Sequence, residues 1–419
     1  MTNILRSMRK PIFTSALVSV MVVGLAGCNM DVVNPSVIDA SKFNPNADGQ
    51  TLSLSAQTNF FMAFQSVALY GGFVSEELWS GQTRFQQRNL AARTFAASDD
   101  INSSFFAPLS LAIASNENAV AALASGSGAA SDVNLARSSM NLGFSLELMA
   151  ETMCAGVIQG GPSLTDAQLL DTAVARFTTA VTVATAAGSA GAAIVNQSNV
   201  GLARAYLQQG NYAKAAATAA LVPSSFVTNV VTSSNVSTQG TLGNQIYGLT
   251  VLNDVIVPKR YRIGDPRMQS DSTVPGKTQN GVALVIQSKF KGYADPIRLA
   301  SGLEAQYISA EAALHGSNNT APAISLINAR RSAGAQGPYA GGSDSTSVIT
   351  ELLNQSARDF WMEGKKLGDL RRNPSVSLPA VLTDPAGAPF YASPPAQFGS
   401  NFCAPIPPQE TNTNPNFTS

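Results

Sequence analysis

Histidine is almost absent from this sequence, which has one among 419 residues. Zinc sites and Ser-His-Asp triads both depend on imidazole, so the composition argues against a histidine-based metalloenzyme or hydrolase. Charged residues make up only 12% of the chain, and 26 basic side chains balance 26 acidic ones. A surface that binds phosphates needs an excess of Lys and Arg, so we expect no nucleic-acid partner.

Cysteine is also scarce, with three in the chain. Cys154 and Cys403 lie far apart in the sequence, which leaves open whether they form a disulfide or stay as two buried free thiols. An oxidising compartment would permit the bridge. No uninterrupted run after Cys28 reaches 18 apolar residues, so no later segment predicts a membrane span. The chain is nevertheless 45% apolar, enough for a large core.

The first 28 residues have the three parts of an export signal. Basic residues come first, Ile12–Gly24 is apolar and uncharged, and the sequence LAGC ends at Cys28. The apolar run is short for a membrane span but typical of a signal peptide. Small residues directly before Cys match a bacterial lipobox. We predict a signal peptide over residues 1–27 and a lipid anchor on Cys28; the alternatives are an ordinary signal peptide and a short membrane anchor.

Apolar residues recur at spacings of three and four along much of the chain, which predicts a mainly α fold. Residues 28–50 are rich in Asn, Pro and Asp and predict an irregular leader. We expect residues 51–419 to form a single domain with repeat helices over about 51–222 and 300–372. The helical segments are expected from residue 52 to Gly71 and over 101–123, 136–153, 166–187, 195–209, 212–221, 302–315, 321–333 and 345–363.

The segment from Leu202 to Ala219 has the residue spacing of a tetratricopeptide repeat. Small residues at Ala203 and Ala215 would let two antiparallel helices approach, and Gly210 would make the turn. A true repeat is the interpretation we favour over an ordinary Ala-rich hairpin.

Two regions lack helical periodicity. Residues 223–299 are rich in Ser, Thr, Val, Asn and Gly and predict a loop-rich insertion over the helical body, with a small hairpin. Residues 373–419 are rich in Pro and predict an extended C-terminal tail.

Few residues could carry catalysis. The GKT sequence at 276–278 resembles the end of a phosphate-binding loop, but that motif needs Gly at position 271, where this chain has Asp. His315 is expected to have a capping or solvated role. Glu76 and Glu77 are adjacent and would point apart, so we interpret them as solvated charges. We therefore expect no catalytic residue, no metal, no cofactor and no enzymatic activity.

Several motifs follow one another along the chain in a fixed order. They are GLARAYLQQGNYAKAAATAALVP (201–223), IGDPR (263–267), DPIRL (295–299), EAQYI and AEA (304–312), LINARRSAG (326–334), RDFWMEGKKLGDLRR (358–372) and PIP with NPN (405–416). Together they resemble the SusD/RagB family of surface lipoproteins, which bind nutrients for outer-membrane transporters. Lys365 and Lys366 depart from the family's usual Arg, and residues 223–261 match nothing in it.

The resemblance implies a nutrient-binding protein anchored by lipid in the outer membrane, at the cell surface. Its ligand would be an oligosaccharide and its partner a TonB-dependent, SusC-like transporter. A ligand such as a peptide and a periplasmic scaffolding role are the alternatives. The charged residues of the 358–372 motif are expected to form ion pairs that fix the last helix pair, rather than a binding site. They are Glu363, Asp369, Arg371 and Arg372.

Sugars are bound by flat aromatic faces and by side chains that hydrogen-bond hydroxyl groups. Trp79 lies in a loop-like stretch of Gly and Ser, and it is either a stacking platform or a core residue. Trp361 is expected in the core. The candidate ligand-binding residues are Trp79, Phe73, Arg84, Tyr261 and Tyr293.

Overall fold

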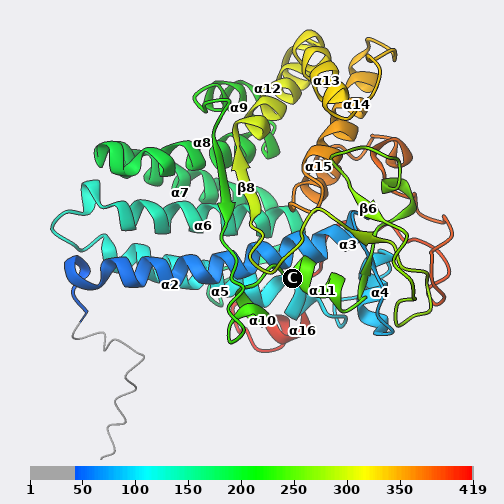
Figure 1. Ribbon diagram of the computed structural model, residues 1–419. Helices are drawn as coiled ribbons and strands as arrows, with labels where there is room; N and C mark the ends of the chain where they lie inside the picture. The colour runs from blue at the N-terminus through cyan, green and yellow to red at the C-terminus, as the bar shows by residue number, and fades with distance from the viewer. Residues whose placement is uncertain (1–42, 418–419) are drawn as a thin grey trace, which may run out of the picture. The chain divides into compact units, whose positions relative to one another are not determined.

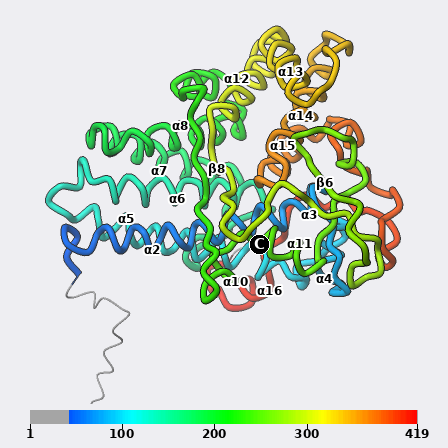
Figure 2. The backbone as a smooth tube through the Cα atoms, viewed as in Figure 1, coloured from blue at the N-terminus to red at the C-terminus, as the bar shows by residue number. Residues whose placement is uncertain are grey.

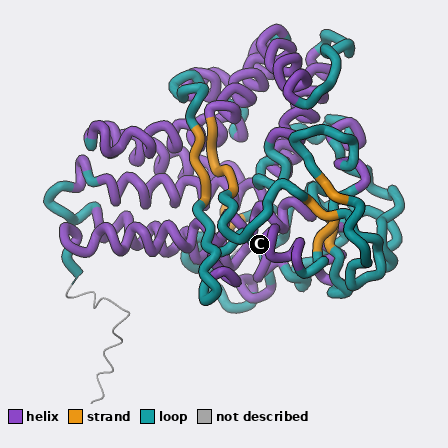
Figure 3. Tube along the Cα trace, viewed as in Figure 1, coloured by secondary structure: helices purple, strands orange, loops and turns teal. Residues whose placement is uncertain are grey.

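The computed structural model describes residues 43–417, and the predicted signal peptide and Cys28 lie outside them. The chain falls into two units, and the larger one begins at Pro45. It is mainly helical, with a few short strands (Figures 1 and 3), as the sequence predicts. No helix within 43–417 has the length and apolar character that crossing a membrane requires.

The longer helices pack one on the next in chain order, from α2 to α9 and then α12 to α14 (Figure 1). They are α2 (Pro45–Ser66), α5 (Ala107–Leu123), α6 (Val133–Thr152), α7 (Asp166–Ala186), α8 (Ala192–Gln208), α9 (Tyr212–Ala219), α12 (Gly302–Ser317), α13 (Ala321–Ala333) and α14 (Ser345–Asp359). The shorter helices are α3 (Gly72–Val74), α4 (Phe85–Ala91), α10 (Gln239–Leu242), α11 (Gln245–Val251), α15 (Lys366–Arg372) and α16 (Pro408–Thr411).

Close packing of α6, α7 and α8 depends on two glycines around one aromatic ring. A Cβ atom on Gly143 would lie 2.8 Å from the ring of Phe177, and one on Gly201 would lie 2.4 Å from it. Phe177 also meets Phe144 edge-on, with ring centroids 4.9 Å apart. The glycines therefore let the three helix backbones approach where a larger residue would separate them.

The predicted tetratricopeptide-like hairpin corresponds to α8 and α9. Ala203 and Ala215 are fully buried between the helices. Gly210 has a φ of 72°, which makes the turn that the sequence predicted. The side chain of Asn211 then caps α9 by accepting a hydrogen bond from the backbone of Lys214.

The predicted leader is wrong for its last residues, because α2 begins at Pro45. Asn44-Pro45 and Asp48-Gly49 are pairs typical of irregular chain, which is why the sequence predicts a leader here. Proline is favoured at the first position of a helix, where its missing N–H has no partner to lose. Asp48 lies in the same first turn, where a negative charge is favourable.

The insertion contains more regular structure than a single hairpin. Four antiparallel strand pairs occur in residues 43–417, three of them with strands from the insertion. The pairs are β1 (Trp79–Ser80) with β5 (Val255–Ile256), β2 (Gly156–Val157) with β3 (Ser163–Leu164), β4 (Val227–Val230) with β8 (Ile297–Ser301), and β6 (Ser270–Asp271) with β7 (Ile286–Gln287). The β4–β8 ribbon runs across the direction of the stacked helices (Figure 3), and β8 leads directly into α12.

The tail from residue 373 has little regular structure, but it is held against the body. Backbone hydrogen bonds join Gly399 to Ala92 and Ala404 to Thr152. The side chains of Phe390 and Phe398 are buried. The tail therefore runs beside the segment around α4 and ends near α16 (Figure 2).

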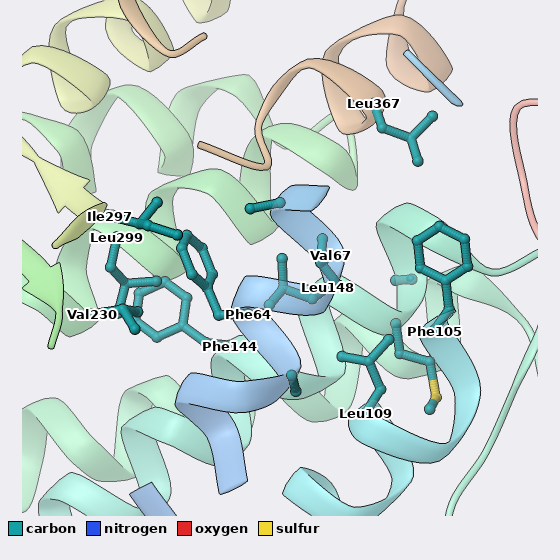
Figure 4. Packing of buried hydrophobic residues seen from close by; sticks show 14 of the residues in the cluster. Phe64, Val67, Phe105, Leu109, Phe144, Leu148, Val230, Ile297, Leu299 and Leu367 are labelled. Carbon is teal, nitrogen blue, oxygen red and sulfur yellow. The ribbon is translucent and has the colours of Figure 1, made fainter. Parts of the chain in front are cut away.

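Most buried apolar side chains belong to one cluster that extends through α2, α5, α6, α7 and α8. Phe64, Phe144 and Leu148 lie near its centre, and β4 and β8 add Val230 and Ile297 (Figure 4). A smaller cluster joins α12, α13 and α14.

Candidate functional site

A polar cleft of about 500 Å³ opens where β1 passes into α4. Its walls combine amide side chains, a hydroxyl, a guanidinium and an aromatic ring. The lining residues are Gln82, Thr83, Arg84, Phe85, Gln86 and Gln279. The side chain of Phe85 is 55% exposed, although it is large and apolar. An exposed ring surrounded by amides is an arrangement suited to a polar ligand with an apolar face.

The backbone of Gly81 fixes the entrance to this cleft. Its N–H donates to the carbonyl oxygen of Asp254 at 2.7 Å, and its own carbonyl accepts from the N–H of Asn280 at 3.0 Å. A Cβ at position 81 would lie 2.6 Å from a methyl carbon of Thr278. Glycine therefore allows the turn that carries Gln279 to approach the segment that carries Gln82.

Trp79 lies in the core beneath the cleft and is only 4% exposed. Its ring stacks on Tyr391 of the tail, with centroids 4.2 Å apart and planes at 10°. The Tyr391 hydroxyl donates to the carbonyl oxygen of Ser80. Of the two alternatives that the sequence left open for Trp79, the structure therefore shows the core residue. No face of its ring is open for stacking on a ligand.

Phe73 and Tyr261 are also buried completely, which contradicts their selection as ligand-binding residues. Tyr261 stacks on Trp361 at 5.7 Å, and its hydroxyl accepts a hydrogen bond from Lys366 at 2.8 Å. Burial raises the pKa of Tyr261 well above its ordinary value. Phe73 was selected because it lies in the loop-like stretch before Trp79, and Tyr261 because of its place in the insertion. Both rings point into the core. The core position of Trp361 agrees with the prediction.

The two remaining candidates lie in different places. Arg84 lines the cleft with its side chain 56% exposed and pairs with Asp100 at 2.7 Å. Tyr293 is half-buried and packs edge-on against Tyr247, with centroids 5.0 Å apart. Tyr293 is not among the residues that line the cleft, so the structure brings only Arg84 of the five candidates to it.

Glu76 and Glu77 are buried, so their interpretation as solvated charges is wrong. Glu77 accepts a hydrogen bond from the backbone N–H of Met362 at 2.7 Å, and Glu76 accepts one from that of Asp384 at 2.6 Å. Burial raises the pKa of each to about 7, and burial lowers the pKa of Lys366 to about 7. The contact of Glu77 joins the segment before the cleft to the 358–372 motif, and that of Glu76 joins it to the tail.

The charged residues of that motif form the predicted ion pairs. Glu363 pairs with Lys289 and Arg298, each at 2.7 Å, and Asp369 pairs with Arg372 at 2.7 Å. Except for the pair of Asp369 with Arg372, all of these ion pairs reach beyond the last helix pair, and two more do so. They are Arg371 with Asp166 on α7 at 2.6 Å and Arg372 with Glu311 on α12 at 2.7 Å.

A second ionic cluster lies under the stacked helices. Arg204 on α8 lies 3.4 Å from Glu147, 3.1 Å from Glu151 and 3.1 Å from Glu304, and Lys365 lies 3.0 Å from Glu304. Neither carboxyl oxygen of Glu147 receives a hydrogen bond from the described part of the chain. Burial raises the pKa of Glu147 well above its ordinary range, although Arg204 opposes the shift. None of these residues lines the cleft.

Cys154 and Cys403 form a disulfide that ties the tail to the end of α6. His315 lies 3.0 Å from Asn373 and 3.7 Å from Glu311, at the end of α12. Within residues 43–417 no group of three or more His, Cys, Asp and Glu side chains is arranged to hold a metal ion.

Sequence reasoning missed most of the cleft. Phe85 and Gln86 directly follow Arg84, and the amide-rich QTRFQQ sequence at 82–87 is a signal that could have found them. Gln279 directly follows the GKT sequence at 276–278 and lies in a turn. Nothing in the sequence places that turn beside Gln82.

Comparison with solved structures identifies the arrangement of helices. A SusD-like carbohydrate binding protein from Bacteroides vulgatus superposes with a TM-score of 0.66 at 14% identity, over 90% of this chain and 98% of the other. The chain has the SusD fold. A SusD superfamily protein from Parabacteroides distasonis shares it with a TM-score of 0.65 at 13% identity, over 90% and 99% of the two chains.

A SusD/RagB family protein from Bacteroides thetaiotaomicron also has the SusD fold, with a TM-score of 0.65 at 12% identity over 88% of this chain and 94% of the other. No protein-family model matches the sequence, and no curated protein matches it either. The resemblance drawn from the short motifs is thus confirmed at the level of the fold, together with the mainly α class.

Proposed function

We propose that this protein is a nutrient-binding lipoprotein of the SusD type and that the cleft at Gln82–Gln86 and Gln279 binds an oligosaccharide. The observation that carries the proposal is an exposed aromatic ring, that of Phe85, beside three glutamine side chains on a SusD fold. The apolar face of a sugar ring can stack on Phe85 while its hydroxyl groups bond with the amides. Binding of this kind needs no catalytic group.

The wider proposal follows the sequence resemblance. The protein is anchored in the outer membrane through Cys28, faces the cell surface and delivers its ligand to a TonB-dependent, SusC-like transporter. The lipobox before Cys28 supports the anchor. A neighbouring gene for such a transporter would support the partnership.

The binding experiment compares two exposed apolar residues. Phe85→Ala removes the ring from the cleft, whereas Leu111→Ala removes an apolar side chain of similar exposure, 53%, from α5. Isothermal calorimetry with starch, fructan, xylan and pectin oligosaccharides should detect binding that Phe85→Ala weakens by about tenfold or more and Leu111→Ala leaves unchanged. Equal binding by the wild type and Phe85→Ala would contradict the assignment of the cleft.

A peptide library is tested beside the glycans, because a peptide ligand is the alternative. Binding of peptides with no binding of glycans would replace the oligosaccharide by a peptide. For the location, Cys28→Ser should abolish incorporation of labelled fatty acid and release the protein from membranes. Protease added to intact cells should degrade the wild-type protein, whereas a periplasmic scaffold would be protected.

A further inference from the structure

Two glutamines from distant parts of the chain donate to a single carboxylate beside the cleft. The Nε2 atom of Gln82 lies 2.9 Å from one carboxyl oxygen of Asp254, and the Nε2 atom of Gln279 lies 2.6 Å from the other. Asp254 is 5% exposed and does not itself line the cleft, whereas both glutamines do. The carboxylate therefore holds the two cleft-lining amides from behind.

This contact fixes which way each amide faces. A glutamine side chain ends in an NH₂ group, which donates, and a carbonyl oxygen, which accepts. Because a carboxylate can only accept, both glutamines must turn their NH₂ groups toward Asp254. Within residues 43–417 no hydrogen bond reaches the carbonyl oxygen of either glutamine. Both oxygens are therefore available as acceptors.

We propose that Asp254 is a positioning residue that presents the carbonyl oxygens of Gln82 and Gln279 to the cleft, so that the cleft selects ligands rich in O–H donors. This inference rests on the proposed function and narrows it. Neutral sugars, whose hydroxyl groups can donate to both oxygens, are the ligand class. Sugars that carry a carboxylate in place of a hydroxymethyl group are disfavoured, because that group has no proton to donate and meets two acceptors.

Among the described residues that line the cleft only Arg84 is charged, and its guanidinium group could favour an acidic sugar. Its guanidinium group is already paired with Asp100 at 2.7 Å, so part of its charge and donor capacity is satisfied within the protein. The expected preference is therefore for the neutral ligand. The binding test therefore includes the acidic sugar beside each neutral one, so that tighter binding of the acidic sugar would be detected.

The binding test uses sugars that differ only in the carboxyl group. Oligogalacturonate, alginate-derived oligomannuronate and oligoglucuronate are each compared with their carboxyl-reduced forms by calorimetry. In every pair that binds, we expect the neutral member to bind the wild-type protein about tenfold or more tightly than the acidic member. An acidic member that binds as tightly as its neutral counterpart overturns the proposal.

The variant Asp254→Asn separates positioning from general structural damage. An asparagine can accept from one glutamine and donate to the other, so one of the two amides turns over and offers its NH₂ group to the cleft. The ratio of neutral to acidic binding should then fall about tenfold. A purely structural role would weaken both members of a pair equally and leave the ratio unchanged, which overturns the proposal. The control Gln86→Ala changes a cleft amide that Asp254 does not hold.

A second measurement does not depend on any ligand. Selective ¹⁵N labelling of glutamine should show the NH₂ groups of Gln82 and Gln279 protected from exchange with water in the wild type and unprotected in Asp254→Ala. Unprotected groups in the folded wild type overturn the positioning role. If neither member of any pair binds, the ligand selection fails, whereas binding of starch, fructan or xylan oligosaccharides decides the proposed glycan function separately. The NH₂ signals report in either case whether Asp254 orients the glutamines.

Discussion

The ring of Trp79 lies nearly parallel to that of Tyr391, with centroids 4.2 Å apart, so the tail of the chain packs on the strand that leads to the cleft. The two residues come from opposite ends of the described sequence. Tyr391 also holds the strand of Trp79 by donating to the carbonyl oxygen of Ser80. The strand that leads into the cleft is therefore held by a residue of the tail.

Trp79→Ala should destabilise the protein by about 3–5 kcal/mol, because it removes a large buried ring. Tyr391→Phe keeps the stacked ring and loses only the hydroxyl, so it should cost about 1 kcal/mol. Urea denaturation measures both values. If Trp79→Ala weakened glycan binding without loss of stability, Trp79 would be a ligand contact after all.

Glu147 should make the protein less stable as the pH rises. Burial raises its folded-state pKa above the ordinary value of 4.5, so the folded state binds the proton more tightly than the unfolded state does. The stability from this group is complete below pH 4.5 and is lost as the pH rises through the folded-state pKa. Glu147→Gln, which resembles the protonated form, should remove this loss in free energies of unfolding measured between about pH 5 and about pH 8.

Two variants provide the comparison for Glu147. Glu117→Gln removes a carboxylate from a partly exposed pair with Arg176 and should keep the wild-type pH dependence. Arg204→Met leaves the buried carboxylates without their main partner and should cost about 3–5 kcal/mol. A pH dependence that is unchanged in Glu147→Gln would assign the effect to another group.

Glu311 should act in the opposite direction. Burial alone would raise its pKa, but Arg372, the nearby His315 and a hydrogen bond from Asn373 outweigh burial and lower the pKa to about 2. The stability from this group is present above pH 4.5 and is lost as the pH falls through about 2. Glu311→Gln should cost about 3 kcal/mol at neutral pH and make acid unfolding less steep. Acid unfolding identical to that of the wild type would contradict this role.

The disulfide should be a major source of stability. It joins residues separated by 249 positions, and closing a loop of that length restricts the unfolded chain by about 5 kcal/mol in the chain-entropy description. The double variant Cys154→Ser with Cys403→Ser should therefore unfold at a clearly lower urea concentration. Mass spectrometry of non-reduced peptides should find the bridge in the wild type. Two thiols that react freely in the folded wild-type protein would rule the bridge out.

The sequence predicts the helices because their signals are local. The apolar spacing and the turn at Gly210 define α8 and α9 without any distant contact. The sequence also predicts that the charges of residues 358–372 pair, since so many in one helical motif need partners. It does not identify those partners, such as Glu311 for Arg372, because they lie on other helices.

The parts of the site that sequence reasoning missed depend on distant segments. Trp79 stands among Ser and Gly and gives no sign that a tyrosine of the tail covers it. Glu76 and Glu77 were expected in water because their buried neighbours come from residues far along the chain. A local signal did exist, because the pair is flanked by apolar Val74 and Leu78.

The Gly81 backbone connects three stretches of chain, those of Asp254, Asn280 and β1 itself, and the tail covers the same place through Tyr391. No tail residue lines the cleft, but a fragment that ends before the tail lacks the ring that stacks on Trp79 and the hydroxyl that donates to Ser80. The support of the strand before the cleft is thus complete only when the tail is present, and a chain clipped before Tyr391 would lose it.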